Sequence, residues 1–313
     1  MTTKLKEINK TINQLDKKFN FRNLRPIHDS LVLKRISAFV QSKNWFEKTA
    51  LKENAGISFV RKYKSWISSS KLNHLINIQK YKYSCFTQGT TESFNLFYLK
   101  NINCRFRSFR GEYKYHFFAW RHCVKFEFLE KDKIRKNDAV VISLPYADNG
   151  GMHPEMQLVI DRCNQLKVPV LIDCAYFGAC RGISFDFNQA CIQAITFSLS
   201  KIFPVVYARI GMRLTRNYDD DTLDIYNMKN LSYINRHSAS IGELLVEKFS
   251  PDFIPNKYEE LQKSYCKKLN LKESNTVLLG LGEAGLKQFN RGDKWNRLCL
   301  SGLYEMHKKT NRK

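Results

Sequence analysis

The chain has 313 residues, 43% of them hydrophobic, which is enough for one large and one small domain with a buried core. Its 52 lysines and arginines exceed its 29 aspartates and glutamates, and the formal net charge of +23 invites a nucleic-acid hypothesis. The basic residues are spread along the chain without an RRM, KH, zinc-finger or clear helix-turn-helix signature, so a basic solvated surface is the simpler interpretation.

The amino-terminal sequence is too polar for a secretory signal, and the chain has no run of about 18 apolar residues, the length that a membrane helix needs. We therefore expect a soluble cytoplasmic protein. The nine cysteines contain no C-x-x-C pair, and the histidines share no metal-ligand spacing with them. Free thiols and no metal site follow from this pattern.

Three regions follow one another along the chain. Residues 1–75 are polar and helical in pattern, with apolar side chains at helical spacing, and we expect them to cover the large domain or a partner subunit. Residues 76–235 alternate helices with short apolar strands, which predicts an α/β large domain with a mainly parallel sheet and ligands at the carboxyl ends of its strands. Residues 236–313 form a small, shortened C-terminal α/β domain in this interpretation.

An aspartate ends the most apolar strand of the second region. Residues 168–172 read as a buried strand, Asp173 follows it directly, and Tyr176 comes three residues later. A carboxylate at the end of a buried strand needs a partner. The nitrogen of a pyridinium ring is one such partner, whereas a helix N-cap is the ordinary role of an isolated aspartate here.

The next strand, at 194–198, leads into a group of polar side chains. Ser198, Ser200 and Lys201 follow in quick succession, and Arg209 comes eight residues after the lysine. A lysine amine can form a Schiff base with a carbonyl, and hydroxyls with a guanidinium can bind a phosphate dianion. A Ser-Leu-Ser-Lys run in isolation is more often a solvated loop, so the spacing of the whole set carries the interpretation.

Together these residues resemble the fold-type I pyridoxal-phosphate (PLP) enzymes, specifically the class I/II aminotransferase family. The resemblance implies that Lys201 anchors the cofactor and shuttles a proton, and that Asp173 keeps the pyridine nitrogen protonated so that the ring acts as an electron sink. It places Tyr176 on the phenolic oxygen of the ring. The phosphate then falls to Ser198, Ser200 and Arg209.

Upstream segments extend the resemblance. Gly89 and Thr90 look like the glycine turn that opens a helix under the phosphate, where backbone amides bind anions. Tyr113 matches the aromatic residue that stacks on the cofactor ring, with Tyr115 as the alternative and core packing as the competing role for either. The loop at 144–154 resembles the one whose asparagine bonds the ring oxygen; Asn149 is the favoured match.

Asp148 is the alternative to Asn149 in that loop, depending on where the gap falls. Near the C-terminus, Trp295-Asn-Arg-Leu-Cys-Leu is similar to the strand whose arginine clamps the α-carboxylate of the substrate, which puts Arg297 in the clamp and leaves Arg291 as the alternative. Arg297 could equally be a surface charge in so basic a chain.

The resemblance implies a PLP-dependent aminotransferase that moves an amino group from an amino acid to a 2-oxo acid or other carbonyl acceptor, acting as a homodimer. A PLP-dependent lyase or decarboxylase on the same scaffold is the first alternative, because the electron-sink apparatus is shared. A catalytically silent PLP-binding or nucleic-acid-binding regulator is the second.

Overall fold

A computed structural model of the chain describes residues 3–228, 232–283 and 285–310. The helices of these segments are α1 (Thr3–Phe19), α2 (Ser30–Val40), α3 (Trp45–Ala50), α4 (Ala55–Ser68), α5 (Thr90–Lys100), α6 (Tyr115–Phe118), α7 (Met156–Leu166), α8 (Thr222–Tyr226), α9 (Arg236–Lys248), α10 (Phe253–Leu269) and α11 (Ser301–Thr310). The strands are β1 (His74–Ile76), β2 (Tyr83–Thr87), β3 (Arg105–Ser108), β4 (Phe126–Phe128), β5 (Asp138–Ser143), β6 (Val170–Cys174), β7 (Ser184–Asp186), β8 (Ile192–Ser198), β9 (Gly211–Thr215), β10 (Lys272–Glu273), β11 (Leu279–Gly282) and β12 (Asn296–Cys299). Short 3-10 turns lie at η1 (Ile78–Lys80), η2 (Leu129–Lys131), η3 (Phe177–Ala179), η4 (Val206–Ala208) and η5 (Lys287–Phe289).

A seven-stranded sheet in the order β2-β9-β8-β6-β5-β3-β4 forms the centre of the molecule. From β8 to β4 the neighbours are parallel, whereas β9 runs antiparallel to both β8 and β2. Every residue of β5 and β6 is buried, as expected for strands covered on both faces. The expected mainly parallel α/β sheet is confirmed, and its register aligns Ser143, Asp173 and Thr196 at one edge.

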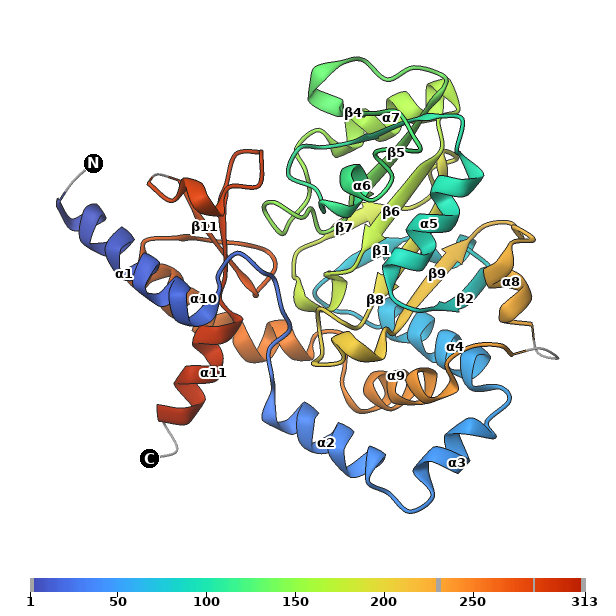
Figure 1. Cartoon of the computed structure of the whole chain (residues 1–313), viewed down its shortest axis with the longest axis horizontal. Helices are drawn as coiled ribbons and strands as arrows, with labels where there is room; N and C mark the ends of the chain where they lie inside the picture. Colours follow the sequence, from blue (N-terminus) through green and yellow to red (C-terminus); the bar gives the residue numbers. More distant parts are fainter. Residues whose placement is uncertain (1–2, 229–231, 284, 311–313) are drawn as a thin grey trace.

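Helices cover both faces of this sheet (Figure 1). On one face α4 and α9 pack together closely, because Gly242 has no Cβ where one would lie 2.6 Å from the ring of Phe59. On the other face α5 contributes Phe94, Phe97 and Tyr98 to an apolar cluster with residues of β3, β5, β6 and β8. Among the helices of the described segments, none has the length and apolarity that a bilayer crossing requires.

The antiparallel sheet β10-β11-β12 forms a second unit with α10 and α11. Helix α1 lies beside this unit rather than on the large sheet (Figure 1). Asn13 accepts a hydrogen bond from Gln288, and Phe21 just after the helix contacts Phe289 in η5. Within residues 1–75, α4 therefore covers the large sheet as expected, whereas α1 packs on the C-terminal unit, and contact with a partner subunit stays a prediction. The periodicity of a helix identifies its apolar face but not the surface that buries it. The predicted boundaries after residues 75 and 235 stay predictions.

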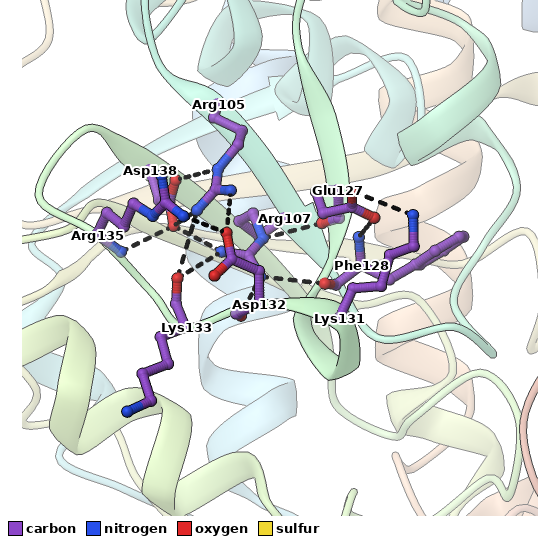
Figure 2. A network of polar contacts seen from close by, with 9 residues as sticks. All are labelled: Arg105, Arg107, Glu127, Phe128, Lys131, Asp132, Lys133, Arg135 and Asp138. Carbon is purple, nitrogen blue, oxygen red and sulfur yellow. Dashed lines mark hydrogen bonds and ion pairs between the residues drawn. The ribbon is translucent and has the colours of Figure 1, made fainter.

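A buried arginine ties the far edge of the large sheet together (Figure 2). The guanidinium of Arg107 in β3 donates to Asp138 at 2.7 Å and to four backbone carbonyls in the segment 127–133. Arg105 bonds both Asp138 and Asp132. Burial by itself would raise the pKa of Asp138, but the hydrogen bonds from Arg105, Arg135 and Arg107 lower it overall. Residues of the basic run at 131–136 therefore stabilise this edge of the sheet through hydrogen bonds and ion pairs.

Candidate active site

A cavity of about 310 Å³ opens at the carboxyl ends of β5, β6 and β8. It is also bounded by the start of α5, by residues 22–24 and by the C-terminal unit. The side chains and backbone that line it come from Arg22, Asn23, Leu24, Thr90, Thr91, Tyr113, Ser143, Pro145, Ala147, Asp173, Ala175, Tyr176, Ser198, Ser200, Lys201, Val206, Arg209, Arg291 and Arg297. Ligands of α/β sheets bind at this edge, because the strand ends and the helix amino termini converge there.

Most residues that the sequence singled out meet at this cavity. They are Thr90, Tyr113, Asp173, Tyr176, Ser198, Ser200, Lys201, Arg209 and Arg297. Gly89 does not line the cavity, but it lies against the guanidinium of Arg209, which does. Asn149 does not line the cavity.

Asp173 presents a buried carboxyl group to the cavity. Its Oδ1 accepts a hydrogen bond from the backbone nitrogen of Ala175 at 3.0 Å. Burial raises the pKa of Asp173 to about 7, while this hydrogen bond and the positive charge of Lys201 act in the opposite direction. A carboxyl group in this state ionises readily once a cationic partner enters the cavity, which is what a protonated ring nitrogen would supply.

The amine of Lys201 also lies in the cavity, three residues beyond the end of β8. Its Nζ donates to the backbone carbonyl of Leu24 at 3.1 Å. No carboxylate in the described part of the chain forms an ion pair with it. A hydrogen bond to a neutral carbonyl leaves the amine available for reaction with a carbonyl compound more readily than an ion pair would.

An anion cradle surrounds the start of α5. Gly89 has a φ of +76° and precedes the helix, and a Cβ there would lie 2.6 Å from Nη2 of Arg209. Arg209 donates to the hydroxyl of Thr91 at 3.3 Å. The first amides of α5 receive no side-chain cap, so they remain available to an anion.

Two serines complete the cradle. Ser198 accepts from the backbone nitrogen of Ser200 at 3.1 Å, and its own hydroxyl donates to Ile210 at 3.2 Å. The Oγ of Ser200 is buried, lines the cavity and has no hydrogen-bond partner among the described residues. A buried hydroxyl is seldom left unpaired, so this atom indicates a missing polar ligand. Hydroxyls, a guanidinium and helix amides together fit a phosphate group.

Only one of the two tyrosines that were candidates for ring stacking, Tyr113 and Tyr115, reaches the cavity. Tyr113 lines the cavity and stacks on Tyr115, with ring centroids 6.1 Å apart. The hydroxyl of Tyr115 instead bonds Asn95 of α5, and this ring does not line the cavity. Burial and the neighbouring Tyr176 and Asp173 raise the pKa of Tyr113. Of the two candidates for ring stacking, the structure brings Tyr113 to the site.

The loop after β5 differs from the expectation. Neither Asn149 nor Asp148 lines the cavity; Pro145 and Ala147 do. The Asn149 side chain accepts from the backbone of Gly151 within its own turn. Asp148 accepts from the backbone of Trp295 at 3.2 Å, and burial raises its pKa to about 6. This tight turn places Ala147 on the cavity lining. Asn149, which was expected to bond the ring oxygen of the cofactor, does not line the cavity.

Arg297 reaches the cavity from β12 and is only 2% exposed. Its Nη1 donates to the backbone carbonyl of Ala147. Among the described residues, no carboxylate forms an ion pair with this guanidinium. A guanidinium in this position can bind a carboxylate through two parallel hydrogen bonds.

Sequence reasoning missed several residues at the site. Arg22 and Ser143 line the cavity without having been predicted, and Arg291 had entered only as an alternative clamp. Glu112 lies just behind: it accepts from the backbone nitrogen of Ser143 at 2.7 Å, and burial raises its pKa to about 8. The position of Glu112 next to Tyr113 in the sequence could have indicated that it lies near the site. No local sequence pattern indicates Arg22, which reaches the cavity through contacts between distant parts of the chain.

No protein-family model matches this sequence, and no curated protein matches it in sequence. Solved structures do share its fold. The aminotransferase AspB from Helicobacter pylori has a TM-score of 0.66 at 12% identity, covering 90% of this chain and 88% of its own. The histidinol-phosphate aminotransferase from Clostridium acetobutylicum has a TM-score of 0.62 at 15% identity, covering 92% and 96%.

A PLP-bound C-S lyase from Staphylococcus hominis is also similar, with a TM-score of 0.64 at 12% identity, covering 93% of this chain and 89% of that one. At sequence identities this low, the structural similarity establishes the fold alone. The chain therefore has the fold-type I architecture that its motifs predicted.

Proposed function

We propose that this protein is a PLP-dependent aminotransferase that moves an amino group from an amino acid to a 2-oxo acid or other carbonyl acceptor. The observation that carries the proposal is that the Lys201 amine, the buried Asp173 carboxyl and the unpaired hydroxyl of Ser200 all face one cavity. When bound, PLP supplies an electron-withdrawing ring that makes the α-proton of an amino acid acidic.

The residues divide the work of holding such a cofactor. Ser198, Ser200 and Arg209, with the amides at Gly89 and Thr90, form the phosphate site. Asp173 pairs with the ring nitrogen and keeps it protonated, because a cation beside a buried carboxyl group stabilises its ionised form, which in turn stabilises the positive charge on the nitrogen.

The remaining lining residues position the reacting groups. Tyr113 covers one face of the ring, and Tyr176 donates toward the oxygen on its edge. Lys201 holds the cofactor and afterwards moves the α-proton, since its amine is anchored to a neutral carbonyl. Arg297 binds the α-carboxylate and thereby orients the α-proton toward the lysine.

The first experiment is a titration of the purified protein with PLP, followed by a screen of amino acids, both recorded as absorption spectra. Conversion of the bound cofactor to the pyridoxamine form supports transamination. A lyase or decarboxylase would leave the cofactor in its aldehyde form and release a cleaved product, and a silent binding protein would show no conversion at all.

Lys201→Ala is the variant that tests the anchor. It should abolish the visible absorbance of the protein-bound cofactor and all turnover, because no other lysine of the described segments lines the cavity. Lys64→Ala is a matched control: burial lowers the pKa of Lys64, but its Nζ donates to Tyr81 away from the site. Borohydride labelling of the Lys201→Ala protein at another lysine would show that the anchor is misassigned.

A further inference from the structure

The cavity carries more positive charge than a cofactor phosphate and one α-carboxylate would use. Its lining has a single carboxyl group among the described residues, that of Asp173. Five cationic side chains line it: Arg22, Lys201, Arg209, Arg291 and Arg297.

The four guanidiniums of this set differ from most arginines of the large sheet. Arg105, Arg107 and Arg213 form ion pairs with aspartates at 2.7 Å or closer. Within the described residues, no carboxylate forms an ion pair with any of the four guanidiniums that line the cavity. Arg22 is exposed to solvent, but Arg291 is partly buried and Arg297 is buried, and charges at such sites are normally paired, so the missing partners of these two point to anionic groups of a ligand.

Arg291 is the least satisfied of them. Its Nε is buried and has no hydrogen-bond partner among the described residues, and its Nη2 makes one long bond of 3.5 Å to the carbonyl of Glu112. Burial lowers the pKa of Arg291, and the nearby charge of Arg297 acts in the same direction. Tyr176, Asp148 and Glu112 act in the opposite direction without forming an ion pair with Arg291, and an anionic ligand would further reduce the repulsion between the two guanidiniums.

Arg22 joins Arg291 on the side of the C-terminal unit. Its guanidinium lies over the ring of Phe289, 6.0 Å from the centroid, and Phe289 precedes Arg291 by two residues. Arg209, by contrast, lies against Gly89 and Thr91 at the start of α5. Arg22 therefore lies against the segment that carries Arg291, whereas Arg209 belongs to the phosphate cradle at the start of α5.

We propose that the amino-acid substrate carries a second anionic group, a carboxylate or a phosphate, on its side chain, and that Arg291 with Arg22 binds it. This proposal rests on the proposed function. With Arg209 assigned to the cofactor phosphate and Arg297 to the α-carboxylate, these two guanidiniums remain. A neutral side chain would leave the buried Nε of Arg291 without a partner, and the net charge of +23 favours the approach of an anionic substrate.

Equilibrium binding tests the proposal without requiring turnover. Cofactor-loaded protein is titrated calorimetrically with glutarate, with 3-phosphonopropionate and with valerate, which share an acid group but differ at the far end. We expect a dianion to bind more tightly than valerate, and the comparison of the first two distinguishes a carboxylate from a phosphate. Arg291→Gln should weaken the dianion at least about tenfold and leave valerate nearly unchanged.

Two further variants make the result interpretable. Arg22→Gln changes an exposed side chain, should fold normally and should weaken the same dianion, while Arg162→Gln on the exposed face of α7 should change nothing. An equal loss for valerate and dianion in Arg291→Gln would mean that Arg291 helps to clamp the α-carboxylate, and the proposal would fall. Selective dianion binding by protein that converts no amino acid would instead count against the proposed function alone.

Discussion

Two buried carboxyl groups, Asp173 and Glu112, lie at the back of the cavity, and the charge of Asp173 adds to the burial that raises the pKa of Glu112. Burial is the main cause that raises both pKa values, to about 7 and about 8. Asp173 opens into the cavity, whereas Glu112 is held by the backbone and hydroxyl of Ser143. The first is therefore suited to pair with a ligand cation and the second to remain neutral.

Asp173→Asn should lower the transamination rate at least about 10²-fold, because the amide has nearly the same shape but cannot stabilise a positive charge on the ring nitrogen. The phosphate cradle should still retain part of the cofactor. Single-turnover kinetics and cofactor content after dialysis measure the two effects separately. Asp161→Asn on α7 is the control, and a rate near that of the unchanged protein in Asp173→Asn would refute the pairing.

Glu112 predicts a pH dependence of stability. Its pKa is raised on folding, from 4.5 to about 8, so the folded state holds a proton that the unfolded state releases in this range. The free energy of unfolding should therefore fall as the pH rises between these values, by at most about 1.4 kcal/mol per pH unit. Glu112→Gln keeps the hydrogen bonds to Ser143 and removes this contribution.

Urea unfolding of the cofactor-free protein across that pH range measures the effect. Glu112→Gln should show a shallower decline than the unchanged protein, whereas Glu260→Gln, whose side chain is 84% exposed, should follow the unchanged protein. Parallel curves for all three proteins would mean that Glu112 ionises normally in the folded state.

At the scale of elements, the edge of the large sheet depends on an arginine as well as on apolar packing. Arg107 in β3 satisfies Asp138 and the carbonyls of the segment that leads from β4 to β5 (Figure 2). This segment carries no regular structure apart from η2, so its backbone groups need these donors.

Arg107→Met should cost about 3–5 kcal/mol of unfolding free energy, because it removes one of the partners of Asp138 and leaves several buried carbonyls without donors. Arg135→Met is the matched control: its side chain is 68% exposed and pairs with Asp132, so its loss should stay below about 1 kcal/mol. Urea unfolding measures both. Comparable losses in the two variants would show that the network contributes no more than a surface ion pair.

At the scale of the molecule, the cavity is completed by parts of the chain that are far apart in sequence. Residues 22–24 reach it from the N-terminal segment, and Leu24 accepts the hydrogen bond of Lys201. The C-terminal unit holds this segment in place, since Cys299 donates to the carbonyl of Phe21 at 2.8 Å. The substrate side of the site therefore depends on how both ends of the described chain pack together.

We predict a homodimer with the cavity near its interface, as the family resemblance implies. Tyr207 is 96% exposed and follows Val206, which lines the cavity, so this ring is a candidate contact. Tyr207→Glu should shift cofactor-loaded protein toward monomer in sedimentation velocity. Leu158→Glu, at a 68% exposed position on α7, serves as the control. Active protein that sediments only as a monomer would rule the dimer out.

The sequence by itself determined the parallel sheet and the residues at its strand ends. Buried β-branched runs predict β5, β6 and β8, and parallel strands bring their carboxyl ends to one edge. Asp173 and Lys201 therefore had to meet once the strands paired, because each lies at or just beyond a strand end. Their chemical roles rest on the resemblance and remain proposals.

Only the tertiary structure decided which other side chains face the cavity. The turn after β5 directs Ala147 inward in place of Asn149, since the side-chain direction in a tight turn depends on its backbone bonds and not on residue type. Arg22 and Arg291 enter the site through contacts between segments more than 200 residues apart. Periodicity and spacing report local geometry, whereas the surface that buries a helix or surrounds a charge is set by packing across the whole chain.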